Sequence, residues 1–400
     1  MADRNDDDIV LAAPVRTPIG KFGGALASLS AADLGTEAAR ACLERAGLDA
    51  ARVDQVIFGH GRQAGGGPNS ARQIAHRAGV PFDRPAYTVN QACGSGLQAV
   101  LSAARTILLG EAEVVLAGGT ESMSNTPYLL PRARWGYRLG NAEIVDGMYK
   151  DGFNCPLAEM VMGETAEELA EECGIDRAAS DSWAVESQNR SERARARGRF
   201  DPEIAPVKVP GKKGETVVDR DEHPRDGVTL DSLVKLGPVF REGGRVTAGN
   251  ASGITDGAAA LVVASRRAAA ELGLPVVARL AGWEVVGVEP RIMGIGPVPA
   301  VQKLLKKKGL STRDIDEVEL NEAFACQVLA CLKDLDFDHG KVNPDGGAIS
   351  LGHPIGATGA RILVTLLHGM RERDLERGIA TLCVSGGLGL AALVEREEAA

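Results

Sequence analysis

Apolar and polar positions alternate along most of the chain in blocks that predict strands followed by helices. The runs VIFGH and EVVLAGG, at 56–60 and 113–119, are short and apolar, which predicts buried strands. The segments 39–46 and 97–104 contain good helix formers, and 97–104 is apolar on nearly all sides, which predicts a buried helix. Strands that alternate with helices favour a mostly parallel sheet covered by helices on both faces, so we expect an α/β fold.

The same order of blocks occurs twice, which indicates an internal duplication. The segment ARACLERAGLDAARVDQVIFGH, from Ala39, matches VQKLLKKKGLSTRDIDEVELNE, from Val301. Both predict a helix, a glycine cap, a short loop and a strand. Further on, CGSGLQAVL matches IGATGARIL and the strand EVVLAGG matches ATLCVSGG. The aligned pairs are Gly47 with Gly309, Leu48 with Leu310, Asp54 with Asp316, Gly96 with Gly359 and Gly118 with Gly386.

The duplication divides the chain into two halves and an insertion. The N-terminal half comprises 1–123 and 249–272, and the C-terminal half comprises 273–400. In 124–248 the content of Pro, Gly and charged residues rises and the repeat is lost, so this region is interpreted as an insertion. Its first part, SNTPYLLPRARWGYRLG, carries clustered aromatic and arginine side chains that suit either an oligomer contact or an ordinary surface loop.

Two further features of the insertion allow predictions. Thr165 and Ser180 are each followed by acidic residues, which predicts that helices start there. Arginines then occur at every second position of 193–199, a pattern that predicts either a solvated helix end or a phosphate-binding patch on an acidic protein.

Cys93 is the first candidate for chemistry. It precedes the predicted buried helix, and Gly94, Ser95 and Gly96 form the turn between them. Unpaired N–H groups and the helix dipole favour a thiolate at this place, so a lowered pKa and attack on an acyl carbon are expected. The alternative, a buried structural cysteine, is common for a free thiol.

The second half supplies a partner for that thiol. The counterpart of Cys93 in the duplication falls within the segment 352–356, GHPIG. Equivalent positions of two halves meet near a pseudo-twofold axis, so Cys93 and His353 are predicted to lie together. His353 stands between Gly352 and Pro354 on a tight turn before a helix, where an imidazole can act as the base for a thiol.

For the other cysteines of the second half, the local sequence pattern by itself favours a structural role in the core. Cys383 ends an apolar strand before a glycine pair, and a core cysteine in a strand is the simplest interpretation of that pattern. Cys326 and Cys331 follow Asn321 in a helical stretch and are predicted to be core residues. Seven scattered cysteines without metal-like CxxC spacing favour a reducing compartment, and we expect the cytoplasm.

Composition and charge exclude several other classes of protein. The net charge of -9 argues against a general nucleic-acid or anionic-membrane surface. No apolar run is long enough to span a bilayer, and the acidic start MADRNDDDIV lacks the pattern of a secretory or transit peptide. With 44% hydrophobic residues over 400 positions, the chain has material for a large core.

One competing motif starts at the same helix. The residues 94–99, GSGLQA, fit the G-x-G-x-x-A form of the dinucleotide-binding fingerprint. The preceding apolar run is short and is interrupted by Asn90 and Gln91, and Glu121 is the only acidic residue near the expected offset. A dehydrogenase is therefore a distant alternative.

Several motifs in one order identify a family resemblance. QACGSGLQA, GGTESMS, VTAGNASGITDGAAA, NEAFA, GGAISLGHPIGATGAR and CVSGGLG each resemble patterns of the thiolases, and together they span essentially the whole chain. The resemblance implies a duplicated five-layered α-β-α-β-α fold with an inserted loop domain that binds coenzyme A, assembled as a homotetramer. It also implies acyl transfer between CoA thioesters with no metal or redox cofactor.

The resemblance assigns roles to individual residues. Cys93 matches the acylated nucleophile, His353 its activating base, and Cys383 the acid/base for the α-proton of the donor. Asn321 matches a residue that fixes a water, which with His353 resembles one oxyanion hole, and the backbone N–H groups of Cys93 and Ser385 resemble the second. Positions that match the coenzyme A site are Met162, Ala248 and Ser252 near the pantetheine, and Arg225 and Ser232 near the nucleotide.

The expected activity is the condensation of two acetyl-CoA to acetoacetyl-CoA, or the reverse thiolysis. Many short-chain members carry His where this chain has Val161, so a 3-ketoacyl-CoA thiolase of broader chain length in fatty-acid degradation is the alternative. From another class, a catalytically silent protein that binds CoA or a dinucleotide also fits the same shape.

Overall fold

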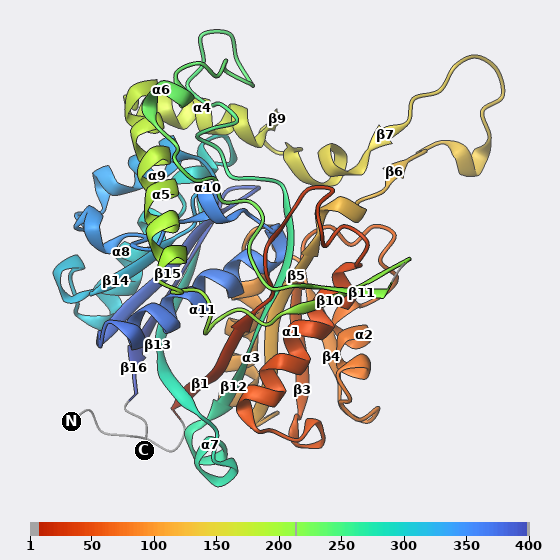
Figure 1. Ribbon diagram of the computed structural model, residues 1–400, viewed down its shortest axis with the longest axis vertical. Coiled ribbons are helices and arrows are strands. Elements are labelled where there is room, and N and C mark those ends of the chain that lie inside the picture. The colour runs from red at the N-terminus through yellow and green to blue at the C-terminus, as the bar shows by residue number, and fades with distance from the viewer. Residues whose placement is uncertain (1–7, 213, 398–400) are drawn as a thin grey trace.

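The computed structural model describes residues 8–212 and 214–397. Within them a ten-stranded sheet follows the order β14-β15-β16-β13-β1-β12-β5-β3-β4, with the short strand β2 paired to β12. The N-terminal half lies beside the C-terminal half, shown in blue in Figure 1. The strands of this sheet are β1 Ile9–Arg16, β2 Gly20–Lys21, β3 Gln55–His60, β4 Ala86–Val89, β5 Val114–Ser122, β12 Thr255–Ser265, β13 Val276–Gly287, β14 Glu317–Leu320, β15 Arg377–Val384 and β16 Leu388–Arg396.

Three hydrophobic clusters define the layers around this sheet. One packs α1 and α2 on the N-terminal strands, a second packs α8 and α9 on the C-terminal strands, and the third surrounds α3 and α11 and includes residues from strands of both halves. Because β1 and β13 pair over only a few residues, the halves behave as two sheets with α3 and α11 between them. This is the five-layered arrangement that the resemblance to thiolases implies. The helices of the layers are α1 Ala31–Ala46, α2 Ser70–Arg77, α3 Ser95–Leu108, α7 Arg266–Leu272, α8 Pro297–Lys308, α9 Ala325–Asp334, α10 Ala348–Leu351 and α11 Ile355–Glu372.

The prediction of a mostly parallel sheet is wrong. Among the described strands of the main sheet, β3 runs parallel to β4 and β5, and β14 runs parallel to β15, whereas the other pairs are antiparallel. The strands β1, β12, β13 and β16 join their neighbours without a helical crossover of the βαβ type, which a count of alternating blocks does not detect.

The duplication is visible in the coordinates. Gly47 and Gly309 cap α1 and α8 in the left-handed conformation, with φ of 60° and 66°. Asp54 accepts the backbone N–H of Val114, and Asp316 accepts that of Arg377 at the same point of the second half. These matched contacts join the start of β3 to β5 and the start of β14 to β15.

One aligned pair of the sequence analysis is wrong. Gln55 pairs with Val115, and Glu317 pairs with Gly378, so Gly118 corresponds to Thr381 instead of Gly386. The letters GG occur in both segments but at different distances from the start of the strand. Strand register depends on the backbone partner, which local sequence similarity does not report.

Two glycines allow the halves to meet closely. A Cβ on Gly96 would lie 2.7 Å from the backbone nitrogen of Ala360, and a Cβ on Gly359 would lie 2.4 Å from that of Leu97. These contacts are reciprocal, as a twofold relation between α3 and α11 requires. Side chains at these two positions would force the helices apart.

The insertion contains two helices whose starts differ from the prediction. Helix α4, Met162–Glu172, begins three residues before Thr165, and Glu164 accepts the backbone N–H of Val161 at 2.8 Å. Helix α5, Arg177–Ala196, begins before Ser180, and the Asp176 side chain caps it. Asp caps as effectively as Ser or Thr, so the earlier acidic residue fixes the start. The other insertion elements are β6 Tyr128–Leu129, β7 Val145–Asp146, β8 Asn154–Cys155, β9 Met160–Val161, β10 Val207–Gly211, β11 Gly214–Val218 and α6 Leu230–Leu233.

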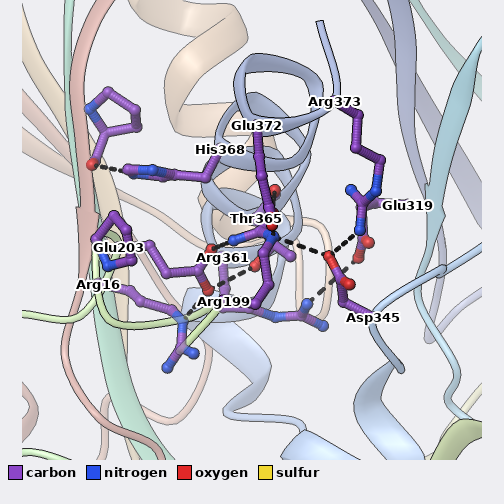
Figure 2. A network of polar contacts seen from close by, with 12 residues as sticks. Arg16, Arg199, Glu203, Glu319, Asp345, Arg361, Thr365, His368, Glu372 and Arg373 are labelled. Atoms are coloured by element: carbon purple, nitrogen blue, oxygen red, sulfur yellow. Dashed lines mark hydrogen bonds and ion pairs between the residues drawn. The ribbon is translucent and has the colours of Figure 1, made fainter. Parts of the chain in front are cut away.

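The arginines of 193–199, at the end of α5, form neither a phosphate-binding patch nor a helix end that is merely solvated. Arg197 pairs with Asp345 at 2.6 Å, and the fully buried Arg199 pairs with Glu203 at 3.2 Å and with Asp345 at 2.9 Å. Figure 2 shows this network beside α11, where Glu203 also accepts from the buried Arg16. Arg197 and Arg199 therefore fasten the insertion to the central layer, whereas Arg193 and Arg195 pair within the insertion.

A long arm projects from the body at residues 126–146, drawn in yellow in Figure 1. Its short strands β6 and β7 pair antiparallel. Trp135 is 87% exposed and Leu139 is 96% exposed. Large apolar side chains exposed on an extended arm are typical of a contact surface. Elsewhere, no helix in the described residues is long and apolar enough to cross a membrane.

Candidate active site

A cavity of about 270 Å³ opens where the two halves and the insertion meet. Its lining is largely apolar and includes the three side chains for which sequence analysis proposed chemistry, Cys93, His353 and Cys383. The other lining residues are Arg62, Met123, Tyr149, Gly152, Phe153, Val161, Met162, Gly163, Val239, Phe240, Ala251, Ser252, Gly253, Ile254, Met293, Ala323, Phe324, Ile355 and Ser385.

Cys93 reaches the cavity from a strained turn. Ala92 has a φ of 44°, a left-handed conformation that costs a non-glycine residue on the order of 1 kcal/mol or more. The Ser95 hydroxyl stabilises the turn, because it accepts the Gln91 N–H at 2.8 Å and donates to the Ala92 carbonyl at 2.7 Å. Helix α3 begins directly afterwards, so Cys93 lies at its N-terminal end as predicted.

His353 meets Cys93 as the duplication predicts. Its Nε2 lies 3.3 Å from the Cys93 sulfur, and its Nδ1 lies 2.6 Å from the Thr358 hydroxyl. That hydroxyl donates to the Pro354 carbonyl at 3.0 Å, so it accepts from Nδ1–H of the neutral ring. The lone pair of Nε2 therefore faces the thiol, which is the tautomer that a base for Cys93 requires.

The expected low pKa of Cys93 is wrong for the free protein. Burial raises the pKa of this thiol above its ordinary value, although the charge of Arg62 and backbone N–H groups of Ser385 and Cys93 act against it. Burial likewise lowers the pKa of His353 to about 3, and the charges of Arg361 and Arg62 contribute. Because desolvation is the largest influence on both groups, the resting pair is a neutral thiol bonded to a neutral imidazole.

Cys383 lines the same cavity as Cys93. It is 1% exposed and belongs to the last residues of β15. Burial raises its pKa well above the ordinary value, and a negative charge on Cys93 raises it further. The two thiols therefore resist ionising together, and the interpretation of Cys383 as a mere core cysteine is incomplete. Cys326 and Cys331 are buried core residues, as predicted.

The second half contributes a buried polar turn after β14. Asn321 is 1% exposed, and its amide oxygen and nitrogen have no hydrogen-bond partner in the described residues. The neighbouring Glu322 has several partners, with its carboxylate accepting from Trp183 at 3.0 Å and Ser187 at 2.7 Å. Glu322 thus fixes the turn that carries Asn321.

The positions assigned to coenzyme A divide into two groups. Met162 and Ser252 line the cavity. Ala248, Arg225 and Ser232 are exposed and lie outside its lining. Ser232 belongs to the capping box of the short helix α6, so its hydroxyl bonds locally to Thr229.

Some residues around the cavity escaped the sequence analysis as site residues. Glu121 is fully buried and accepts from the backbone of Gly61, Arg62 and Gly356, and its Oε1 lies 3.2 Å from Nε2 of His60. The Glu121 carboxylate therefore joins the loop after β3 to the start of α11, and it is not free to bind a ribose. The sequence feature that could have pointed to Arg62 is a charged residue two positions after the end of a buried strand.

Comparisons with known proteins agree with this geometry. Residues 9–267 match the family described as "Thiolase, N-terminal domain", and residues 274–396 match "Thiolase, C-terminal domain". The chain therefore belongs to the thiolase family, which excludes the dehydrogenase alternative. Its fold is the duplicated thiolase fold.

Three similar proteins illustrate the match. The acetyl-CoA acetyltransferase of Cupriavidus necator is 50% identical over 391 residues, which cover 98% of this chain and 100% of that protein. The crystal structure of the Bacillus anthracis acetyl-CoA acetyltransferase has a TM-score of 0.96 at 46% identity, with 98% of this chain and 99% of that one covered. Human mitochondrial 3-ketoacyl-CoA thiolase in complex with CoA has a TM-score of 0.93 at 41% identity, with coverage of 98% and 99%.

Proposed function

We propose that the protein is an acetyl-CoA C-acyltransferase that condenses two acetyl-CoA to acetoacetyl-CoA and CoA, reversibly, through an acyl group on Cys93. The observation that carries the proposal is the 3.3 Å contact between His353 Nε2 and the Cys93 sulfur, in a cavity that also holds Cys383. A nucleophile, its base and a second acid/base are the groups that two-step acyl transfer requires.

In the first half-reaction Cys93 attacks the carbonyl carbon of acetyl-CoA while His353 takes its proton. The bond from that carbon to the CoA sulfur breaks, and Cys383 gives its proton to the departing thiolate. The site then holds acetyl-Cys93, a protonated His353 and a Cys383 thiolate. This charge pair explains how buried groups that are neutral at rest can ionise, since each charge has an opposite partner nearby.

In the second half-reaction the Cys383 thiolate takes the α-proton of a second acetyl-CoA. The raised pKa of this thiol makes its thiolate a strong base for that proton. The resulting enolate attacks the acetyl carbon on Cys93, the bond to the Cys93 sulfur breaks, and that sulfur recovers its proton from His353. Acetoacetyl-CoA leaves, and every group has returned to its starting state.

Oxyanions that develop in these steps need hydrogen-bond donors. The backbone N–H groups of Cys93 and Ser385 both act on the Cys93 sulfur, which supports a hole for the oxygen of an acyl group attached there. The unpartnered amide of Asn321 supports a second hole, formed by a water on Asn321 together with His353. Loss of one such donor typically costs about a hundredfold in rate or more.

Coenzyme A is the proposed partner. Met162 and Ser252 line the apolar cavity and suit pantetheine, and the exposed Arg225 and Ser232 suit the nucleotide end of coenzyme A. Ala248, assigned to the pantetheine from the resemblance, is exposed outside the cavity lining and suits a stretch of pantetheine nearer the surface. The exposed apolar arm supports assembly as a homotetramer. All seven cysteines are free, which supports a cytoplasmic location.

Thiolysis of longer 3-ketoacyl-CoA thioesters is the second candidate function. Val161 lines the cavity next to Met162, where an apolar wall leaves room for an acyl chain. The two functions use the same chemistry in opposite directions, so chain length is what separates them.

Intact-protein mass spectrometry after mixing with acetyl-CoA tests the proposal. We expect one acetyl adduct on the wild-type protein and on Cys173→Ala, because Cys173 lies outside the cavity lining, and no adduct on Cys93→Ala. Absence of the adduct from wild-type protein that still binds CoA would favour a catalytically silent CoA-binding protein.

A further inference from the structure

Arg62 places a buried cation in the wall of the active-site cavity. Its side chain follows β3, the residue is 7% exposed, and it lines the cavity with Cys93 and His353. The buried Nε has no hydrogen-bond partner, and among the described residues no hydrogen bond or ion pair reaches the guanidinium. Buried cations are normally paired, because desolvation of an isolated charge is costly.

The nearest carboxylate does not satisfy this cation. Glu121 accepts the backbone N–H of Arg62 at 3.1 Å, and its remaining capacity is taken by Gly61, Gly356 and His60. The guanidinium instead lies against the backbone of Gly152, where an added Cβ would be 2.4 Å from Nε. Glu121 thus bonds to the backbone of Arg62 and acts on its charge without a hydrogen bond to the guanidinium, while the side chain lines the cavity.

The cavity has two chemically different walls. Cys93 packs with Met123, Met148, Phe153 and Ile355, and Arg62 joins this wall through Gly152. The second wall contains Cys383, which packs in a separate cluster with Met162, Phe240 and Phe324. An acyl chain attached to Cys93 therefore shares a wall with Arg62.

The duplication sharpens the contrast between the walls. Counted on from the paired strands β3 and β14, Phe324 stands at the sequence position that corresponds to Arg62, and it packs edge-on against Phe240 with ring centroids 6.4 Å apart. After its first central strand, one half thus carries an aromatic ring at this sequence position and the other half carries a guanidinium. A methyl-ended acyl chain offers nothing that a guanidinium would bind.

We propose that Arg62 recognises a carboxylate at the far end of the acyl chain, so that the enzyme accepts 3-ketoacyl-CoA thioesters of dicarboxylic acids. This inference rests on the proposed function and names its substrate class. A guanidinium forms paired hydrogen bonds with a carboxylate, and such charge-assisted bonds gain strength where water is excluded.

Thiolysis of such a substrate balances with the same groups. Cys93 gives its proton to His353 and attacks the keto carbon, the bond between that carbon and the α-carbon breaks, and Cys383 protonates the departing α-carbon to give acetyl-CoA. The carboxyacyl group remains on Cys93 with its carboxylate toward Arg62. The Cys383 thiolate then takes the CoA thiol proton, CoA takes the carboxyacyl group, and Cys93 recovers its proton from His353.

A matched pair of substrates tests the inference on the wild-type enzyme. The two are six-carbon 3-ketoacyl-CoA thioesters that end in a carboxylate or in a methyl group, and the measured quantity is the ratio of their kcat/KM values. We expect the ratio to exceed one in the wild type and to fall about 100-fold in Arg62→Met. Arg62→Lys is expected to recover part of the ratio, because it keeps the charge without the planar fork.

The ratio of the two kcat/KM values separates recognition of the terminal carboxylate from activation of Cys93. Arg62 also acts on the ionisation of Cys93, but that effect enters both kcat/KM values and cancels. A wild-type ratio below one, or a ratio unchanged in Arg62→Met, would overturn the inference, and the first result needs no variant. Loss of the Cys93 acetyl adduct would instead overturn the proposed function, so the two failures are distinguishable.

Discussion

The two halves of the molecule share one plan but differ where their central strands end. Asp54 and Asp316 make equivalent loop contacts, and the left-handed caps of the preceding helices match. By the same register, Thr120 on β5 corresponds to Cys383 on β15. Thr120 donates to the Ala31 carbonyl inside the core, whereas Cys383 lines the cavity. Equivalent backbones therefore provide a common scaffold, and a single difference at a strand end decides whether the side chain packs in the core or lines the cavity.

The interiors of the halves differ in a second way. The C-terminal half has buried carboxylates at Glu317 and Glu319, where the N-terminal half has Gln55 and Ile57. Arg361 lies 3.5 Å from Glu319, and Figure 2 shows these groups beside the network of Arg199. The insertion is fastened to both halves, through Arg16 on the N-terminal side and Asp345 on the C-terminal side.

The largest expected effect comes from replacing the two cavity cysteines, Cys93 and Cys383, for which separate roles are proposed. Cys93→Ser is expected to lose acyl transfer by at least about a thousandfold, because a serine alkoxide is far harder to generate than a thiolate. Cys383→Ser is expected to retain acetylation of Cys93 while losing α-proton exchange and condensation. Mass spectrometry of the adduct and deuterium exchange into acetyl-CoA measure the two steps separately.

Condensation of acetyl-CoA at near wild-type rate by Cys383→Ser would contradict its assignment as acid/base. Cys331→Ala serves as a matched control, since Cys331 is a buried cysteine outside the cavity lining.

A smaller effect is expected from making the halves alike at Glu317. Burial raises the pKa of this carboxyl from 4.5 to about 7, although Arg373 opposes the shift. The folded state then binds the proton more tightly than the unfolded state, so this contribution to stability is full below pH 4.5 and is lost as the pH rises through 7. Glu317→Gln introduces the residue type that the N-terminal half has at the equivalent Gln55. The variant is expected to lack a decline of roughly 3 kcal/mol in the free energy of unfolding as the pH rises.

Urea unfolding of both proteins at pH 5 and at pH 8 measures the difference. A wild-type free energy of unfolding that changes with pH in parallel with that of Glu317→Gln would show that Glu317 ionises normally in the folded state.

The smallest expected effect concerns the wall near Val161. Wild-type enzyme is expected to cleave a six- or eight-carbon 3-ketoacyl-CoA at least as well as acetoacetyl-CoA, since each buried methylene contributes up to about 0.8 kcal/mol. Val161→His is expected to narrow the preference toward acetoacetyl-CoA by introducing a polar ring into an apolar wall. Values of kcat/KM for both substrates and both proteins decide it, and a wild type confined to acetoacetyl-CoA would disprove the expectation.

Local pattern was sufficient for much of the fold. The glycine caps, the buried helix behind Cys93 and the proximity of Cys93 to His353 could all be predicted, because each depends on residues close in sequence or on the duplication. The starts of α4 and α5 were misplaced because acidic residues further upstream make the capping contacts. The alignment of Gly118 failed because strand register depends on a partner strand.

Some properties were determined by the sequence alone: the thiolase plan, its duplication and the choice of Cys93 as the candidate nucleophile. Only the tertiary structure decided which strands of the sheet run antiparallel, that burial raises the pKa of Cys93, and that the arginines at 197 and 199 pair internally. It also decided that Arg62 faces the cavity unpaired. The reason is that desolvation and charge pairing are sums over neighbours brought together from distant parts of the chain, and no local stretch of sequence contains that sum.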